Sequence, residues 1–324
     1  MALMPRSLAG SPLLLLTLIG GHAMAQEAGK WIDRMNRAVD ELNYRGTFVH
    51  FIDGSSETLN IVHRNVAGNG GERILSVEGP RREIVRENDQ VRWILPDQKL
   101  VLLETRKDVS PLVSALPSYS ADLEPHYEIN LRATTRVANR PAQMIEIKPR
   151  DEFRYGYVLW LDQETAMPLK SQLMDERGHT VEQILFTQIN MAADISAADL
   201  EPTIDTTGFS TMRTPASEPA VAGVAANVPW RASAVPGGFR LSAATQSPMP
   251  GSKYPVEHLV YSDGLATVSV FIEDPKTKAE VNDGFSKVGS TNTFSLTLRG
   301  RKVTAVGEVP RQTVRSIASS LVAE

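Results

Sequence analysis

The stretch VEHLVYSDGLATVSVFIE, from Val256 to Glu273, decides how the C-terminal part of this chain folds. Two runs rich in β-branched and aliphatic residues flank Asp263-Gly264, a dipeptide that tolerates the positive φ angles of a tight turn. From Val268 to Ile272 every second residue is aliphatic, which gives the second run one fully apolar face. The stretch therefore predicts a β-hairpin with one buried face.

The residues around this hairpin predict a small antiparallel sheet backed by one helix. Further strands are expected at Phe239–Ala244, Thr293–Leu298 and Lys302–Val306. A final helix is expected after Pro310, because proline suits the first turn of a helix. Its apolar stripe is formed by Val314, Ile317, Ala318, Leu321 and Val322.

The N-terminal part predicts one helix followed by an antiparallel meander. A helix is expected at 28–43, where Trp31, Met35, Val39 and Leu42 form one apolar stripe. Ten short strands separated by Gly, Asn, Asp and Pro follow. They are expected at Thr47–Ile52, Thr58–His63, Arg73–Val77, Glu83–Glu87, Val91–Leu95, Val101–Glu104, Met144–Lys148, Tyr155–Asp162, Leu169–Met174 and Val181–Thr187.

Several of these strands carry apolar residues on both faces, as Tyr155–Leu161 does. A curved sheet with a covered concave face requires this pattern. A second helix or lid is expected at Ser110–Leu116, ending at Pro117.

The first 25 residues are typical of a secretory signal peptide. Arg6 supplies the positive charge, an apolar run covers Leu13–Ile19, and Ala23-Met24-Ala25 is a small-residue cleavage pattern. The alternative, a membrane anchor, needs about 18 apolar residues, and this run is shorter. We therefore expect an exported, periplasmic mature chain that begins at Gln26, with no transmembrane segment of its own. It has no cysteine, so neither disulfides nor thiolate metal sites are available.

Composition divides the mature chain into two modules of different charge. Residues 26–228 hold 22 basic and 30 acidic residues, whereas residues 229–324 hold 11 basic and 8 acidic residues. Residues 203–228 are rich in Thr, Ala, Pro, Gly and Ser, as linkers are. We expect domains at 26–202 and 229–324 joined by a linker at 203–228, with modules that meet different partners.

Several stretches in both modules have a distinctive sequence. Besides the hairpin, they are LNYRGTFVHF (Leu42–Phe51), ETLNIVHR (Glu57–Arg64), REIVREND (Arg82–Asp89), RYGYVLWLD (Arg154–Asp162) with the following PLKSQLMDERG, and VTAVGEVP (Val303–Pro310). Together they resemble the RseB/MucB family of periplasmic sigma-E regulatory proteins. The resemblance implies a mixed α+β fold, mainly antiparallel. Its N-terminal domain is similar to the LolA/LolB-like lipoprotein carriers, with an unclosed β-barrel whose concave face is covered by helices.

The sequence offers no motif for catalysis, a metal or a cofactor. It lacks H-x-x-x-H and H-E-x-x-H pairs, a G-x-S-x-G elbow, and the lysine that would turn Ala67–Gly71 into a phosphate loop. His50 and His63 lie on predicted strands, where pairing with main chain or carboxylates is favoured over a shared metal. A basic groove with interleaved aromatic residues, which nucleic acid would require, is absent too.

Two sets of residues are candidates for binding. The first is a cationic hairpin tip with nearby arginines, whose side chains suit carboxylate or phosphate: Arg299, Arg301, Lys302, Arg311 and Arg315. The alternative for this set is a solvated turn that blunts a sheet edge. The second set belongs to the N-terminal sheet and lines either a core or an acyl-chain cavity: Trp93, Leu95, Tyr157, Leu159, Trp160 and Leu173.

The resemblance implies a negative regulator of the envelope stress response, including alginate regulation. Such a protein binds the periplasmic part of a membrane anti-sigma factor of the RseA/MucA type and shields it from regulated proteolysis, until lipid or lipopolysaccharide weakens the complex. A lipid or lipoprotein carrier without a regulatory role is the alternative, and an envelope hydrolase is a third hypothesis. Exposed edge strands also allow a homo-oligomer.

Overall fold

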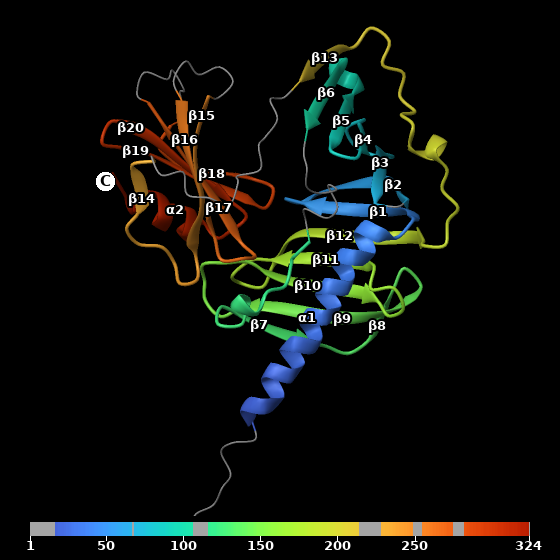
Figure 1. Ribbon diagram of the computed structural model, residues 1–324, viewed down its shortest axis with the longest axis horizontal. Coiled ribbons are helices and arrows are strands. Elements are labelled where there is room, and N and C mark those ends of the chain that lie inside the picture. The colour runs from blue at the N-terminus through green and yellow to red at the C-terminus, as the bar shows by residue number, and fades with distance from the viewer. Residues whose placement is uncertain are drawn as a thin grey trace, which may run out of the picture.

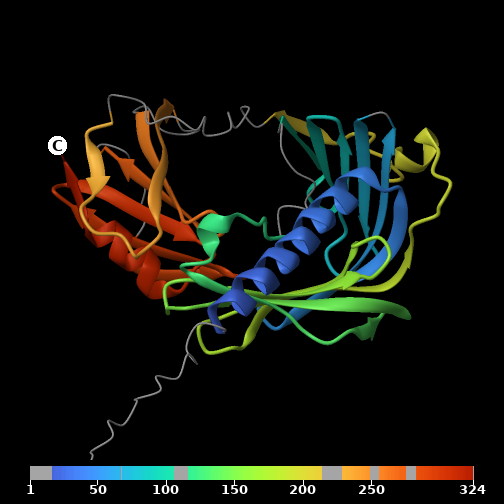
Figure 2. The ribbon, with the colours of Figure 1, turned by 60° about the horizontal axis from the view of Figure 1, so that its bottom comes forward.

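The computed structural model describes residues 17–66, 68–105, 116–213, 228–248, 255–274 and 282–323. They form a large, strongly curved sheet with a long helix on its concave side and a smaller sheet beside it (Figures 1 and 2). We call the parts that carry these sheets the N-terminal module and the C-terminal module. The expected architecture, mainly antiparallel α+β with an unclosed N-terminal sheet, is confirmed.

Helix α1 (Thr17–Glu41) crosses the concave face of the large sheet (Figure 2). Its buried residues Ala28, Ile32, Met35 and Val39 recur at spacings of three and four, which places them on one face of the helix. The helix expected at 28–43 is thus present, but it begins earlier and ends two residues sooner. Within the residues that the structure describes, no helix is both long and apolar enough to cross a membrane.

The large sheet has thirteen strands, and all its pairs are antiparallel except β13 with β6. The order is β13-β6-β5-β4-β3-β2-β1-β12-β11-β10-β9-β7, with β8 also on β9; β13 and β7 do not meet, so the sheet stays open. The bounds are β1 (Tyr44–Ile52), β2 (Ser55–Val66), β3 (Asn69–Ser76), β4 (Glu83–Glu87), β5 (Gln90–Leu95), β6 (Leu100–Thr105), β7 (Tyr127–Leu131), β8 (Thr135–Val137), β9 (Arg140–Pro149), β10 (Gly156–Asp162), β11 (Pro168–Met174), β12 (Thr180–Asn190) and β13 (Ser210–Arg213).

The concave face of this sheet carries two apolar cores, and α1 contributes to both. Val39 packs with Tyr44, Phe48 and residues of β2 to β4, whereas Ile32 and Met35 pack with β7, β9 and β10. Among the described residues, short 3-10 helices lie in the connections at η1 (Pro96–Gln98), η3 (Ala121–Leu123) and η4 (Ala197–Leu200). The helix expected at Ser110–Leu116 lies outside the described residues, apart from Leu116.

The chain leaves the large sheet along its outer edge. The carboxylate of Glu83 is buried on β4 and accepts hydrogen bonds from the backbone nitrogens of Thr203 and Ile204 at 2.9–3.0 Å. β13 then runs parallel to β6. Residues 203–213, which the composition places in the linker, are therefore part of the N-terminal module.

The C-terminal module is a six-stranded antiparallel sheet of order β15-β16-β17-β20-β19-β18, covered by helix α2 (Arg311–Ser319). Its strands are β15 (Arg240–Pro248), β16 (Pro255–Ser262), β17 (Thr267–Glu273), β18 (Gly284–Val288), β19 (Thr291–Leu298) and β20 (Arg301–Gly307). The hairpin of β16 and β17 is confirmed, and its aliphatic residues from Val268 to Ile272 are buried.

The end of the chain differs from the expectation. α2 begins after Pro310 as expected, but Leu321 and Val322 do not continue it. They lie in strand β21 (Leu321–Ala323), which pairs with β14 (Trp230–Ala232). The backbone pairing with β14 replaces the last helical turn, while Leu321 stays buried in the same core.

Candidate binding site at the junction of the two modules

Asp263, at the turn of the β16–β17 hairpin, joins the two modules. Its Oδ1 accepts hydrogen bonds from the backbone nitrogens of Leu265 and Ala266, which fixes the turn. Its Oδ2 accepts from the N-terminal module: Arg154 Nη1 lies at 2.6 Å and Tyr127 Oη at 2.9 Å. The turn that closes the hairpin therefore also anchors the C-terminal module.

Arg154 lies between the modules with no exposed side-chain surface. Besides Asp263, it contacts Asp151 at 2.9 Å and donates to the carbonyl of Gly237. Its guanidinium also lies over two aromatic rings, with Cζ 5.4 Å from the centroid of the Tyr127 ring and 5.2 Å from that of the Phe239 ring. A buried ion pair is tolerated when hydrogen bonds complete it, and this one is completed by groups from both modules.

The environment of Tyr127 keeps its phenol protonated. Burial raises the pKa of Tyr127, and the neighbouring Asp263 carboxylate raises it further. The phenol therefore acts as a fixed donor to Asp263.

At Gly238 the backbone of the C-terminal module lies close against the ring of His126 in the N-terminal module. Gly238 has φ +87°, and a Cβ placed on it would lie 2.5 Å from the ring of His126. Any other residue would meet both a strained backbone conformation and the ring.

A second set of contacts joins the start of α2 and the start of β19 to the N-terminal module. Thr313 Oγ1 donates to the carbonyl of Phe153 at 2.6 Å. Asn292 Nδ2 donates to Tyr155 Oη at 2.9 Å and to the carbonyl of Val309 at 2.8 Å. The two modules are thus held together by polar contacts at several separate points.

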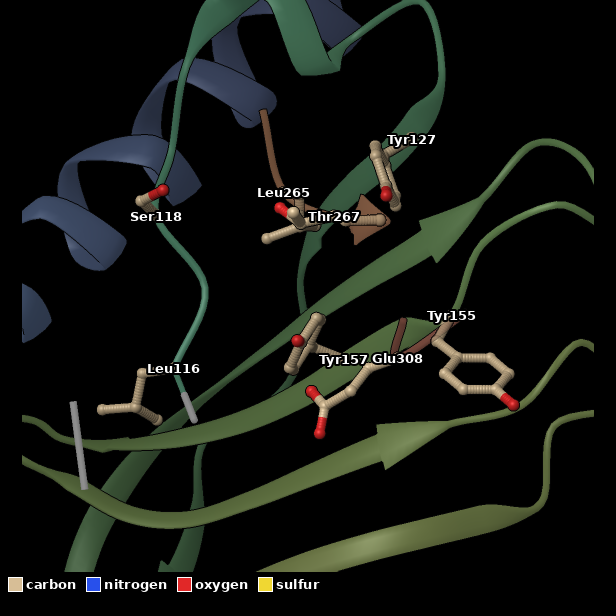
Figure 3. A pocket seen from close by; sticks show the side chains of 9 residues that line it. Leu116, Ser118, Tyr127, Tyr155, Tyr157, Leu265, Thr267 and Glu308 are labelled. Carbon is tan, nitrogen blue, oxygen red and sulfur yellow. The ribbon is translucent and has the colours of Figure 1, made fainter. Parts of the chain in front are cut away.

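A cleft of about 220 Å³ opens between these contacts (Figure 3). Its apolar walls come from Leu116, Tyr127, Tyr157 and Leu265, and Glu308 faces the same space beside Tyr157. Sites that enclose a drug-sized ligand typically measure about 300–1,000 Å³. The cleft is therefore large enough for one side chain or a short piece of acyl chain, and not for a whole lipid.

The six apolar residues predicted as a site do not form one cavity. Tyr157 lines the cleft, and Leu173 lines a smaller cavity that shares Tyr157 and Glu308 with it. Leu159 is buried beneath α1. Trp160 faces the other side of β10, where the Lys170 ammonium lies 4.2 Å from its ring centroid.

The remaining two residues of this set lie on β5, several strands away from β10. Trp93 packs against the core that contains Val39 and donates to Glu104. Leu95, at the end of the same strand, is half-buried.

The predicted cationic set is divided between the two ends of β20. Arg299, with φ +50°, forms the β19–β20 turn, where Arg301 begins β20 and Lys302 pairs with Asp283 at 2.7 Å. At the other end, Arg311 stacks over the ring of Phe285 at 4.7 Å, and Arg315 is exposed on α2. The structure therefore gives two separate basic areas.

The histidines on β1 and β2 do not face each other. His50 contacts the carboxylates of Glu57 and Glu182 at 3.2 and 2.8 Å, and His63 Nδ1 lies 2.7 Å from the carbonyl of Leu42. Pairing with carboxylates and main chain is thus confirmed. Within the described ranges, no group of three His, Asp or Glu side chains is placed to hold a metal.

Comparison with known proteins gives the same family over both modules. Residues 27–204 match the sequence model of the MucB/RseB N-terminal domain, and residues 224–322 match that of the MucB/RseB C-terminal domain. The chain is 36% identical over 322 residues to the sigma factor AlgU regulatory protein MucB of Pseudomonas aeruginosa, with 95% of each chain covered. It is 28% identical over 306 residues to the sigma-E factor regulatory protein RseB of Escherichia coli K12, covering 94% and 93%.

A solved structure resembles the chain over the same length. It is the crystal structure of MucB in complex with MucA(peri), with a TM-score of 0.69 and 33% identity over 92% of this chain and 99% of that one.

Proposed function

This chain belongs to the MucB/RseB family, and from that premise we propose that it is a periplasmic negative regulator of a sigma-E-type envelope stress response. It binds the periplasmic part of a membrane anti-sigma factor of the RseA/MucA type and protects that factor from regulated proteolysis. Residues 1–25 serve as the signal peptide for its export. The observation that carries the proposal is the similarity of both modules to a MucB structure solved with MucA(peri).

The arrangement at the junction supports a binding surface made by both modules. Arg154 and Asp263 hold the modules together, and the cleft beside them presents tyrosine rings and the carboxyl group of Glu308. A segment of the anti-sigma factor that places one apolar side chain in this cleft touches both modules at once. The basic area at Arg311 and Arg315 lies at the start of α2, where Thr313 contacts Phe153, and extends this surface toward acidic groups of the partner. Arg299 to Lys302 lie at the other end of β20 from Glu308 and offer a separate basic contact.

Lipid or lipopolysaccharide acts in this proposal as the releasing signal. A ligand shifts an equilibrium only by its different affinity for the two states. Because the cleft is too small for a whole acyl chain in the present arrangement, a lipid binds better when the modules have moved apart. Lipid binding and partner binding then weaken each other by the same factor.

Calorimetry on the mature chain, residues 26–324, tests the proposal. The chain is titrated with the periplasmic segment of an anti-sigma factor, with and without a lipopolysaccharide fragment. We expect binding of the segment that the lipid weakens. Binding that the lipid leaves unchanged contradicts the release mechanism, and lipid binding without affinity for the segment supports the carrier as the function.

A further inference from the structure

One hydroxyl group lies between two carboxylates that come from different modules. Ser290, in the β18–β19 turn, places its Oγ 2.8 Å from Glu182 Oε2 on β12 of the N-terminal module. The same Oγ lies 2.6 Å from Glu308 Oε1, just after β20 of the C-terminal module. Ser290 is almost fully buried, whereas Glu308 keeps an exposed edge, so the two contacts are partly shielded from bulk water.

The number of hydrogen atoms restricts how these contacts form. A hydroxyl donates one hydrogen, and an ionised carboxylate only accepts. If both carboxyl groups were ionised, Ser290 would bond to one of them and meet a lone pair of the other at hydrogen-bond distance. Both short contacts are hydrogen bonds only when one of the two carboxyl groups carries a proton.

The surroundings identify Glu308 as the protonated member. Glu182 already has a donor on its other oxygen, because His50 Nε2 lies 2.8 Å from Glu182 Oε1. Burial acts to raise the pKa of Glu182, but the hydrogen bonds from His50 and Ser290 outweigh it and lower that pKa. Burial raises the pKa of Glu308; the hydrogen bond from Ser290 opposes this, and the Glu182 carboxylate adds to it.

The other titratable groups around the bridge do not supply the missing proton. His50 contacts Glu57 at 3.2 Å through its other ring nitrogen, and Glu57 pairs with Arg82 at 2.6 Å. These contacts lead away from Ser290. Tyr157 is next to both carboxylates, and burial, with Glu308 and Glu182, raises its pKa. Burial and nearby carboxylates likewise raise the pKa of Tyr155 to about 12.

We propose that docking of the C-terminal module onto the N-terminal sheet takes up one proton from solvent, which Glu308 then holds. In the docked state the Glu308 hydroxyl donates to Ser290 Oγ, and the Ser290 hydroxyl donates to Glu182 Oε2. When the modules separate, Glu308 loses its partner carboxylate and releases the proton to water. Because Glu308 also lines the cleft, the same proton sets the charge that a ligand meets there.

The direction of the pH effect follows from the raised pKa of Glu308. The stabilisation of the docked state by this proton is complete at pH values below the ordinary pKa of glutamate, about 4.3, where Glu308 is protonated in both the docked and the separated state. This advantage is lost as the pH rises through the higher pKa of the docked state. Each unit between the two pKa values changes the ratio of docked to separated molecules tenfold.

Spin labels on the cysteine-free mature chain measure this ratio. Asp97→Cys and Ser319→Cys place one label on an exposed position of each module, and the distance distribution is recorded from pH 5 to pH 8. We expect a longer-distance population to grow with pH. Glu308→Gln should remove this dependence, because an amide donates to Ser290 at every pH. Glu176→Gln, which removes an exposed carboxylate outside the bridge, should keep the wild-type dependence.

The carbon-13 shift of the Glu308 carboxyl group gives a second readout that needs no bridge variant. We expect it to titrate above the ordinary glutamate range in the wild-type chain. Titration of Glu308 at about 4.3 with the modules docked overturns the proposal. So does a Glu308→Gln chain whose distance distribution keeps the pH dependence of the wild type.

Discussion

Replacing Asp263 by alanine should weaken the docking of the two modules by about 3 kcal/mol. The substitution leaves the guanidinium of Arg154 buried without its carboxylate partner from the C-terminal module, and Tyr127 loses its acceptor. It also frees the two backbone nitrogens that Asp263 Oδ1 holds in the hairpin turn. The hairpin itself should persist, because the residues after the turn are buried in the core of the C-terminal sheet.

The magnitude follows from the burial of the pair. Neither Arg154 nor Asp263 has exposed side-chain surface. Removing one member of such a pair typically costs about 3–5 kcal/mol, most of it from the charge left behind. Asp151 keeps its contacts with Arg154, so the low end of this range applies. A loss of about 3 kcal/mol lowers the ratio of docked to separated molecules by more than about a hundredfold.

The distance between labels at positions 97 and 319, recorded at constant pH, is a direct assay of this loss. Asp53→Ala is the matched control, because Asp53 also pairs across the junction, with Lys287 at 3.8 Å, but on the surface. Exposed pairs of this kind contribute about 0–1 kcal/mol. If Asp263→Ala separates the modules no more than Asp53→Ala does, the buried pair does not hold them together. The double change Arg154→Met with Asp263→Ala should restore part of the docking, because no buried charge remains.

Three further changes test other parts of the fold. Glu83→Ala should lower the free energy of unfolding, measured in urea, by about 3 kcal/mol, because Thr203 and Ile204 lose their buried acceptor. It should also make residues 203–213 accessible to a protease, and a variant as resistant as the wild type would contradict this. Ile317→Ala should cost about 2–5 kcal/mol by leaving a cavity under α2, whereas exposed Ser319→Ala should change little. Although burial opposes it, hydrogen bonds from Arg140 and Thr165 lower the pKa of Asp162. The ionised Asp162 stabilises the folded chain fully above about pH 4, and this stabilisation is lost as pH falls through the lowered pKa. Asp162→Asn should therefore make the stability of the folded chain depend less on pH in the acid range, which melting temperatures measured over a pH series check.

The pattern of apolar residues predicted the interior of the fold and missed its edges. Long strands with alternating apolar residues, such as β10 and β17, were found because one face is buried. β8, β13 and β18 were missed, since they are short and largely polar or exposed. β7 and β14 were missed too, although they carry the buried residues Tyr127, Ile129 and Trp230, because each is too short to show a clear alternation. Such strands are held by backbone pairing with a neighbour, which leaves little trace in side-chain composition.

The candidate site was harder to predict because it depends on contacts between distant segments. The dipeptide Asp263-Gly264 indicated a turn, and the second role of Asp263 required Arg154, more than a hundred residues away. Nothing in RYGYVLWLD marks its arginine as buried, since arginine is normally exposed. Ser290 gave no signal either, because a serine in a hairpin turn is common and the two carboxylates beside it come from distant parts of the sequence.

The grouping of predicted residues failed where it ignored strand geometry. Tyr157 and Trp160 are three positions apart on β10, so their side chains point to opposite faces of the sheet. Arg299 and Arg311 are close in sequence, yet strand β20 runs between the turn that holds Arg299 and the helix that begins at Arg311.

The parallel pairing of β13 with β6 determines how far the modules can move after they separate. The N-terminal module holds the chain through Arg213, and the C-terminal module holds it again from Trp230. The intervening chain, fully extended, reaches about 3.3–3.6 Å per residue, or roughly 55–60 Å in all. Over such a reach a short tether keeps its ends at an effective concentration in the millimolar range. Redocking is therefore a first-order step that dilution of the protein does not slow, and any ligand that separates the modules must compete with this fixed local concentration.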